Sequence, residues 1–166
     1  TTVAELQSQI DKTLEYEQYL MPDPTYLNKC VLIAGQDASY GSLYGDGQIN
    51  YGTSTYFNSA HNLISYTYPY AVSGSSASAI IQNINAGVCY ANYTAHGGPE
   101  GWIDPAFTVS DVNTLQNNHK YPLMVGNSCL TNKFDEATCF GEALLRAPEK
   151  GAIGYIGGSS YTYWDE

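Results

Sequence analysis

Residues 30–35 read CVLIAG, a short and continuous run of apolar residues. A run of this length without alternation is typical of a strand that is buried on both faces of a parallel sheet. Comparable runs return at 87–95 (GVCYANYTA), 122–126 (PLMVG) and 152–157 (AIGYIG). The sequence therefore predicts a series of buried strands, of which 30–35 is the first.

The segments between these runs have the features of helices. Residues 2–20 follow a candidate cap at Thr2, and their apolar residues recur at helical spacing: Val3, Leu6, Ile10 and Leu14. Composition and spacing predict further helices at 55–64, 75–86, 108–117 and 138–147, a strand at 65–70, and a Gly- and Tyr-rich loop at 36–54. Strands that alternate with helices indicate an α/β domain with a mainly parallel sheet.

Length and composition exclude several classes of protein. The chain has 166 residues, about one domain, with 43% hydrophobic residues, which argues against disorder. Its 16 acidic and 6 basic residues give a net charge of −10, so a nucleic-acid or anionic-membrane partner is excluded, because an acidic surface repels phosphate. No apolar run is long enough to span a membrane. The N-terminal residues lack the pattern of a signal peptide, and we expect the chain to be a fragment or a processed part of a longer protein.

Four cysteines are present, at positions 30, 89, 129 and 139. An even number permits disulfides, but no cysteine or histidine spacing indicates zinc. Cys30 and Cys89 lie in apolar runs, which favours free buried thiols, and Cys139 is expected to be packed at a helix start. His61 and His119 lie in polar surroundings and are expected to be solvated.

Three reactive side chains follow predicted strands. Asp37 comes after CVLIAG, His96 after CYANYTA and Cys129 after PLMVGNS. In open α/β sheets, sites form beyond the carboxyl ends of the strands. A thiol needs a nearby base to become a nucleophile, an imidazole supplies that base, and a carboxylate orients the imidazole. The N–H groups of Gly97 and Cys129 are candidates for an oxyanion hole.

Each of these residues also has a purely structural interpretation. A cysteine after an apolar strand is commonly a packed thiol, and a lone histidine at a strand end is commonly structural. Asp37 can cap the segment that follows it. The residue types alone leave both interpretations open, although three coincident strand ends favour a site.

Several longer motifs resemble a known family of enzymes. The segments 92–97 (NYTAHG), 126–129 (GNSC), 139–142 (CFGE) and the pair Tyr163-Trp164 resemble the gingipains, which are secreted cysteine endopeptidases of caspase-like fold. The resemblance extends over nearly the whole chain, from DKTLEYE through MPDPTYLNK to the final YW. It implies a three-layer α/β/α arrangement, with residues 1–166 forming one catalytic subdomain of a larger domain that has further strands on both sides.

The resemblance implies a role for particular residues. Cys129 matches the nucleophile, His96 the catalytic histidine, and Asp37 the acid that supports it in the lysine-specific branch; Gly97 and Cys129 match the oxyanion donors. Four further positions match residues that line the primary specificity pocket: Thr94, Asn127, Tyr163 and Trp164. Glu142 resembles a ligand of a structural calcium ion, with backbone oxygens near Asn132 and Phe134. No cofactor is implied for catalysis.

The expected activity is hydrolysis of peptide bonds in proteins, after lysine, by a secreted or cell-surface bacterial enzyme. A cationic side chain requires a carboxylate in its pocket. In the lysine-specific branch that acid lies just beyond the aromatic pair, where this sequence ends in Asp165-Glu166, so these two residues are candidate substitutes. The alternatives are arginine specificity, an inactive caspase-like domain that binds peptides, and a Cys-His acyl transferase or amidase. The flanking chain of the same precursor is the expected partner besides the substrate.

Overall fold

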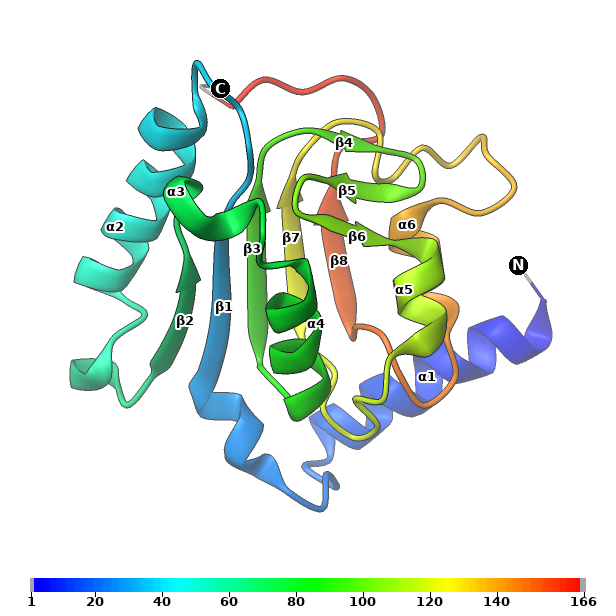
Figure 1. The fold of residues 1–166 in the computed structure, drawn as a ribbon. Helices are drawn as coiled ribbons and strands as arrows, with labels where there is room; N and C mark the ends of the chain where they lie inside the picture. The colour runs from blue at the N-terminus through cyan, green and yellow to red at the C-terminus, as the bar shows by residue number, and fades with distance from the viewer. Residues whose placement is uncertain (1, 165–166) are drawn as a thin grey trace.

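The computed structural model describes residues 2–164, which form a five-stranded sheet, a small second sheet and the surrounding helices (Figure 1). Asp165 and Glu166 lie outside these residues. The strands of the main sheet are β1 (Lys29–Ala34), β2 (Ile64–Tyr68), β3 (Tyr90–Thr94), β7 (Leu123–Asn127) and β8 (Gly154–Gly157). Their order is β2-β1-β3-β7-β8, and every neighbouring pair is parallel. The predicted parallel α/β sheet is thereby confirmed.

The helices and the second sheet connect these strands. The α-helices are α1 (Val3–Glu17), α2 (Asp46–Thr55), α3 (Tyr70–Ser73), α4 (Ala77–Ala86), α5 (Val109–Thr114) and α6 (Phe140–Arg146). Shorter helical turns are η1 (Pro24–Asn28), η2 (Gly41–Gly45) and η3 (Ser59–His61), and the small sheet contains β4 (Gly97–Gly98), β5 (Gly101–Ile103) and β6 (Ala106–Thr108). Across the described part of the chain, no helix combines the length and apolar character that a membrane crossing requires.

Two predictions about the segment 36–64 are wrong. Residues 36–54 contain η2 and most of α2 instead of a loop, and the helix expected at 55–64 is reduced to the single turn η3. The helix α2 buries only Ile49 and Gly52, so it lacks the apolar periodicity that identifies helices in a sequence. Its position depends instead on the close approach of the backbone at Gly45, just before the helix, to Ala34 of β1. A Cβ on Gly45 would lie only 2.7 Å from the Cβ of Ala34.

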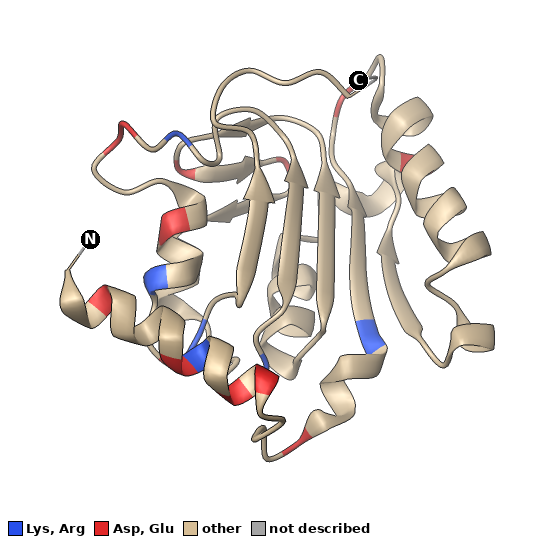
Figure 2. Ribbon diagram, turned by 180° about the vertical axis from the view of Figure 1, so that it is seen from behind, with Lys and Arg blue, Asp and Glu red and all other residues tan. Residues whose placement is uncertain are grey.

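The two faces of the sheet are covered unequally. One face packs against α4, α5, α6 and the small sheet, through a core that includes Ile33, Tyr93, Trp102, Phe140 and Leu144. On the other face, α2 covers β1, and Cys30, Leu32, Ala34 and Ile49 form a smaller core. Figure 2, which views this second face, shows no helix over β3, β7 and the middle of β8. Ile156 of β8, on this face, is 60% exposed.

The apolar face of α1 points away from the protein body. The residues that predicted this helix are all 40–85% exposed: Val3, Leu6, Ile10 and Leu14. The predicted cap is confirmed, since Thr2 and Glu5 form a capping box. The residue that α1 buries is Lys12, at 3% exposure. Figure 2 shows that charged residues gather around α1 and its neighbours, whereas Lys29 is the one charged residue in the strands of the main sheet.

Lys12 caps the C-terminal end of α6. Its ammonium donates hydrogen bonds to the carbonyl oxygens of Leu144, Ala147 and Lys150, at 3.1, 3.2 and 3.1 Å. The last carbonyls of a helix have no partner inside the helix, so a cation is well placed there. Burial lowers the pKa of Lys12 to about 8, so the ammonium form with its three donors predominates at pH 7.

We expect Lys12→Met to destabilise the fold by about 2 kcal/mol, because it removes a charged donor from three carbonyl groups, although that of Leu144 still accepts the N–H of Ala152. For a chain of this size the melting temperature should fall by about 4–8 °C. Urea unfolding monitored by circular dichroism measures the effect. Lys133→Met, which removes a surface ion pair with Glu136, is the control and should change stability little. Equal stability of the Lys12 variant and the wild type would contradict this role.

Candidate active site

Asp37, His96 and Cys129 follow three adjacent strands of the main sheet. Ala34, Thr94 and Asn127, at the ends of β1, β3 and β7, lie side by side in the register. The chain then places each of the three reactive side chains two or three residues further on, at the same edge. The structure therefore brings the three residues to one end of the sheet, as the strand pattern predicted.

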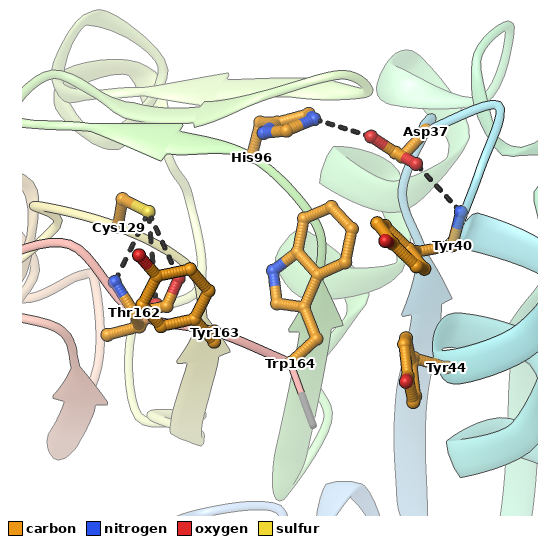
Figure 3. A pocket seen from close by; sticks show the side chains of 8 residues that line it. All are labelled: Asp37, Tyr40, Tyr44, His96, Cys129, Thr162, Tyr163 and Trp164. Atoms are coloured by element: carbon orange, nitrogen blue, oxygen red, sulfur yellow. Dashed lines mark hydrogen bonds and ion pairs between the residues drawn. The ribbon is translucent and has the colours of Figure 1, made fainter. Parts of the chain in front are cut away.

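These side chains line one cavity of about 400 Å³. Its lining consists of Asp37, Tyr40, Tyr44, His96, Cys129, Thr162, Tyr163 and Trp164 (Figure 3). The segment after β8 crosses the end of the sheet and brings the last three of these residues over the site (Figure 1). The lining residues thus lie in the segments that follow β1, β3, β7 and β8.

Asp37 is fixed by three hydrogen bonds. Its Oδ2 lies 2.9 Å from Nε2 of His96, while its Oδ1 accepts the backbone N–H groups of Ser39 and Tyr40 at 2.8 and 2.7 Å. Burial raises the pKa of Asp37, but these hydrogen bonds outweigh it and hold the pKa below its ordinary value of 3.8. Asp37 is therefore an ionised acceptor for the imidazole at neutral pH.

Cys129 lies across the cavity from this pair. Its thiol donates to the carbonyl of Thr162 at 3.6 Å and accepts the N–H of Thr162 at 3.4 Å. Among the described residues, no hydrogen bond joins Cys129 to His96, although both side chains line the same cavity. Leu130, the next residue, has a φ of +62°, which turns the chain sharply after the thiol. Apo structures of enzymes often show such open spacing between catalytic groups.

The other three thiols are in different surroundings. All four cysteines are free, and burial raises the pKa of Cys30, Cys89 and Cys139. Cys30 and Cys139 are fully buried, as predicted, and Cys89 is half-buried. A raised pKa suppresses the thiolate form, so these three are poor nucleophiles.

Trp164 lies between the two sides of the cavity. Its indole meets the imidazole of His96 edge-on with ring centroids 5.0 Å apart, and the Tyr40 ring at 5.9 Å (Figure 3). Tyr40, Tyr44 and Thr162 were not predicted as site residues. The two tyrosines occur in the stretch that was expected to be a loop. Their spacing of four residues places both side chains on the same side only if that stretch is helical.

Two predicted pocket residues are not among those that line the cavity. Thr94 is buried, and its hydroxyl donates to Oε1 of Gln48 in α2 at 2.5 Å. Asn127 is half-buried at the end of β7. Within the described residues neither lines the cavity, whereas Tyr163 and Trp164 do.

Gly97 lies directly against the turn that carries Cys129. A Cβ at this position would lie 2.8 Å from the carbonyl oxygen of Cys129 and 2.9 Å from the Cβ of Ser128. Only glycine permits this approach without a shift of the backbone. The two predicted oxyanion donors, Gly97 and Cys129, are therefore neighbours in space.

Glu142, the expected calcium ligand, already has partners within the chain. Its carboxylate accepts the N–H of Cys139 at the start of α6 and forms an ion pair with Arg146. Arg146 already supplies the positive charge that calcium would bring. Residues 2–164 also contain no group of three or more His, Cys, Asp or Glu side chains that could hold a metal ion. The expected site combines Glu142 with backbone oxygens, which no such group would reveal, so the calcium role of Glu142 stays a prediction.

The remaining histidines are exposed, as predicted. His61 contacts Asn58, while His119 forms an ion pair with Glu15 at 2.6 Å. Neither lies near the cavity lining.

Asp37→Asn is expected to lower peptide hydrolysis about a hundredfold at neutral pH. The amide keeps an oxygen for the N–H groups of Ser39 and Tyr40 but removes the negative charge that orients and stabilises a protonated imidazole. Because the pKa of Asp37 is held low, its contribution is present above pH 4 and is lost only as the pH falls further. The test is the rate of hydrolysis between pH 4 and 9, with Asp135→Asn on the surface as control. Wild-type rates in Asp37→Asn would contradict its role.

Comparison with known proteins connects this arrangement to a family. The sequence model of peptidase family C25 matches residues 1–166. The chain is 45% identical to Lys-gingipain W83 of Porphyromonas gingivalis over 98% of its own length, which is 9% of that relative. It is 28% identical to gingipain R2 of the same organism, over 89% of the chain and 20% of the relative.

Solved structures show the same fold. One described as "Structure of Protease" has a TM-score of 0.91 at 44% identity and covers 98% of this chain, which spans 35% of the solved one. The arginine-specific cysteine proteinase gingipain R gives a TM-score of 0.70 at 26% identity, with 98% of this chain and 39% of the solved chain covered. These similarities confirm the caspase-like α/β fold and the gingipain resemblance. The chain belongs to peptidase family C25.

Proposed function

We propose that this chain carries the catalytic residues of a cysteine endopeptidase. The observation that supports it most strongly is the convergence of Asp37, His96 and Cys129 on one cavity, with Nε2 of the imidazole bound to the carboxylate. With Nε2 engaged, Nδ1 is the ring nitrogen available to accept the thiol proton. The other three thiols have raised pKa values and do not line the cavity, so Cys129 is the proposed nucleophile.

The proposed reaction follows the acyl-enzyme route. His96 accepts the proton of Cys129, and the thiolate attacks the carbonyl carbon of the scissile peptide bond. The N–H groups of Gly97 and Cys129 stabilise the resulting oxyanion. His96 then donates its proton to the leaving amine, and a thioester remains on Cys129. Water, deprotonated by His96, hydrolyses the thioester and restores the thiol.

The proposed substrates are proteins cleaved after lysine. Tyr163 and Trp164 line the cavity beside Cys129, and aromatic walls suit the methylenes of a lysine side chain. The higher identity to a Lys-gingipain than to a gingipain R supports lysine over arginine. The carboxylate that would pair with the ammonium group is assigned to Asp165 or Glu166, outside the described residues.

Covalent labelling tests this function. The chain is incubated separately with lysyl, arginyl and glutamyl chloromethyl ketones, and the adduct is measured by intact mass, with Cys129→Ala as the control variant. We expect a lysyl adduct that the control lacks. An arginyl adduct alone would keep the peptidase and overturn lysine preference. Labelling of Cys129 by iodoacetamide but by none of the ketones would favour the peptide-binding alternative.

We also propose that the chain is one part of a larger catalytic domain. Parallel sheets are normally covered on both faces, yet within residues 2–164 no helix lies over β7 and the middle of β8 on the face that bears Ile156, and the apolar side of α1 is exposed. The chain spans 35% of a solved relative, so the relatives have further chain that can cover these surfaces. The flanking chain of the precursor is the proposed partner.

The proposed location is outside the bacterial cell, at its surface or secreted. The relatives belong to a bacterium and are peptidases of the gingipain family. Few charged residues and many tyrosines, at 13% charged and 16 tyrosines, suit an extracellular protein. Protease protection of the chain in intact cells, compared with lysed cells, measures this location.

A further inference from the structure

The ring of Tyr155 occupies a space that three glycines leave open. Tyr155 belongs to β8 and lies opposite Met124 of β7. A Cβ on Gly126 would lie 2.2 Å from the Tyr155 hydroxyl, one on Gly141 2.7 Å from its ring, and one on Gly157 2.5 Å from its ring. Contacts this short are not possible for real side chains, so all three positions must be glycine for the tyrosine to fit.

The Tyr155 hydroxyl lies beneath the turn that carries the nucleophile. It accepts the indole N–H of Trp102 at 3.3 Å. A Cβ on Gly126 would also lie 3.0 Å from Oγ of Ser128, so the Tyr155 and Ser128 hydroxyls face the same small space. The buried hydroxyls of Ser128 and Thr131 make no hydrogen bond to the described residues, so they are free to pair with the Tyr155 hydroxyl beside them. Ser128 directly precedes Cys129, so this polar cluster supports the turn from below.

A second tyrosine supports the turn that carries His96. The hydroxyl of Tyr93 donates to the carbonyl of His96 at 2.8 Å and to that of Asp104 at 3.3 Å. Tyr93 is fully buried, and burial raises its pKa, so it stays a protonated donor. It fixes the backbone from which the imidazole projects.

Trp102 joins the two tyrosines. Its ring stacks on Tyr93 with centroids 4.7 Å apart at 11°, while its N–H binds Tyr155. Trp102 also lies opposite Gly97 in the small sheet, and it is 1% exposed. One indole therefore contacts the supports of both reactive turns and the strand of the proposed oxyanion donor.

We propose that Tyr93, Trp102 and Tyr155 form a positioning unit that sets the separation between His96 and Cys129. The inference rests on the proposed function. No hydrogen bond joins the imidazole to the thiol among the residues described, so their separation depends on how each turn is anchored. An error of about 1 Å in such a separation can cost about a hundredfold in rate. None of the three residues touches the reacting atoms.

Alkylation of Cys129 tests the unit without a peptide substrate. The rate constant for iodoacetamide is measured by peptide mass between pH 5 and 10 in the wild type, Tyr93→Phe, Tyr155→Phe and Tyr121→Phe. Tyr121 is the matched control, because it is buried and its hydroxyl donates to Asn118, away from the cavity. Cys30 in the same samples reports general loosening of the fold.

We expect Tyr93→Phe and Tyr155→Phe to lower the Cys129 rate about tenfold at pH 6.5, while Tyr121→Phe stays within about twofold. The difference should vanish above about pH 9, where a thiol ionises without help from the imidazole. A purely structural effect would instead accelerate labelling of Cys30. If Tyr155→Phe does not fold, Trp102→Phe removes the donor to the same hydroxyl and should give the same deficit.

Wild-type Cys129 rates in folded Tyr93→Phe and Tyr155→Phe, or in Trp102→Phe, would overturn the unit while leaving the proposed peptidase standing. A wild-type Cys129 that reacts no faster than Cys30 would refute the proposed function itself, and this inference with it. The two failures are therefore distinguished in one series of samples.

Discussion

Cys129→Ala is expected to abolish peptide hydrolysis, with a loss of at least about 10⁴-fold, and to leave the fold unchanged. The substitution removes the sulfur that would form the thioester in the proposed reaction, and no other described thiol lines the cavity. Removal of a nucleophile in an acyl-transfer enzyme commonly costs this much or more. Steady-state hydrolysis of a peptide with lysine at the cleavage site measures the loss.

The matched control is Cys139→Ala, which removes a buried thiol at the start of α6. It should lower the melting temperature because it leaves a small cavity in the core, yet keep most of the activity. Cys129→Ala should lose the activity and keep the melting temperature, since Cys129 is half-buried and its sulfur makes only weak hydrogen bonds. Residual hydrolysis in Cys129→Ala at more than one per cent of wild type would contradict the assignment of the nucleophile.

His96→Ala is expected to reduce hydrolysis at pH 7 by about 10³-fold or more. Without the imidazole, the reaction loses the proposed base for the thiol proton and the proposed acid for the leaving amine. The side chain of His96 is 52% exposed, so its removal should cost little stability. The variant keeps the thiol of Cys129 and the backbone of the proposed oxyanion hole.

This variant has a specific signature in its pH dependence. Alkylation of Cys129 by iodoacetamide should be slow at pH 6.5 and should recover toward the wild-type rate above pH 9, where the thiol ionises alone. Cys30 should react alike in both proteins. An unchanged alkylation rate at pH 6.5 would show that His96 does not activate the thiol.

Most of the sheet could be predicted from the sequence, because buried parallel strands are continuous apolar runs. The helix α2 could not, since it buries two residues and depends on the contact of Gly45 with Ala34 for its place. The helix α1 was found by its apolar spacing, yet that spacing did not tell which side faces inward. Its buried residue is a lysine that caps α6, a contact between residues more than 130 positions apart.

The candidate site, too, could be predicted only where its residues follow apolar strands. Asp37, His96 and Cys129 could be located because each follows a recognisable strand, and parallel strands end at one edge. Tyr40 and Thr162 were not found, since their place in the cavity depends on a π-helical turn and on the segment that crosses back after β8. Thr94 was expected in the pocket, but the unpredicted α2 brings Gln48 to its hydroxyl.

The most direct test of the account is a competition among the four thiols. The folded chain is exposed to limiting iodoacetamide at pH 6.5, and the fraction labelled at each cysteine is followed by peptide mass in the wild type and in His96→Ala. The account predicts that Cys129 reacts at least about tenfold faster than Cys30, Cys89 and Cys139, and that His96→Ala removes this lead. Equal rates at all four cysteines, or a lead of Cys129 that persists without His96, would contradict it.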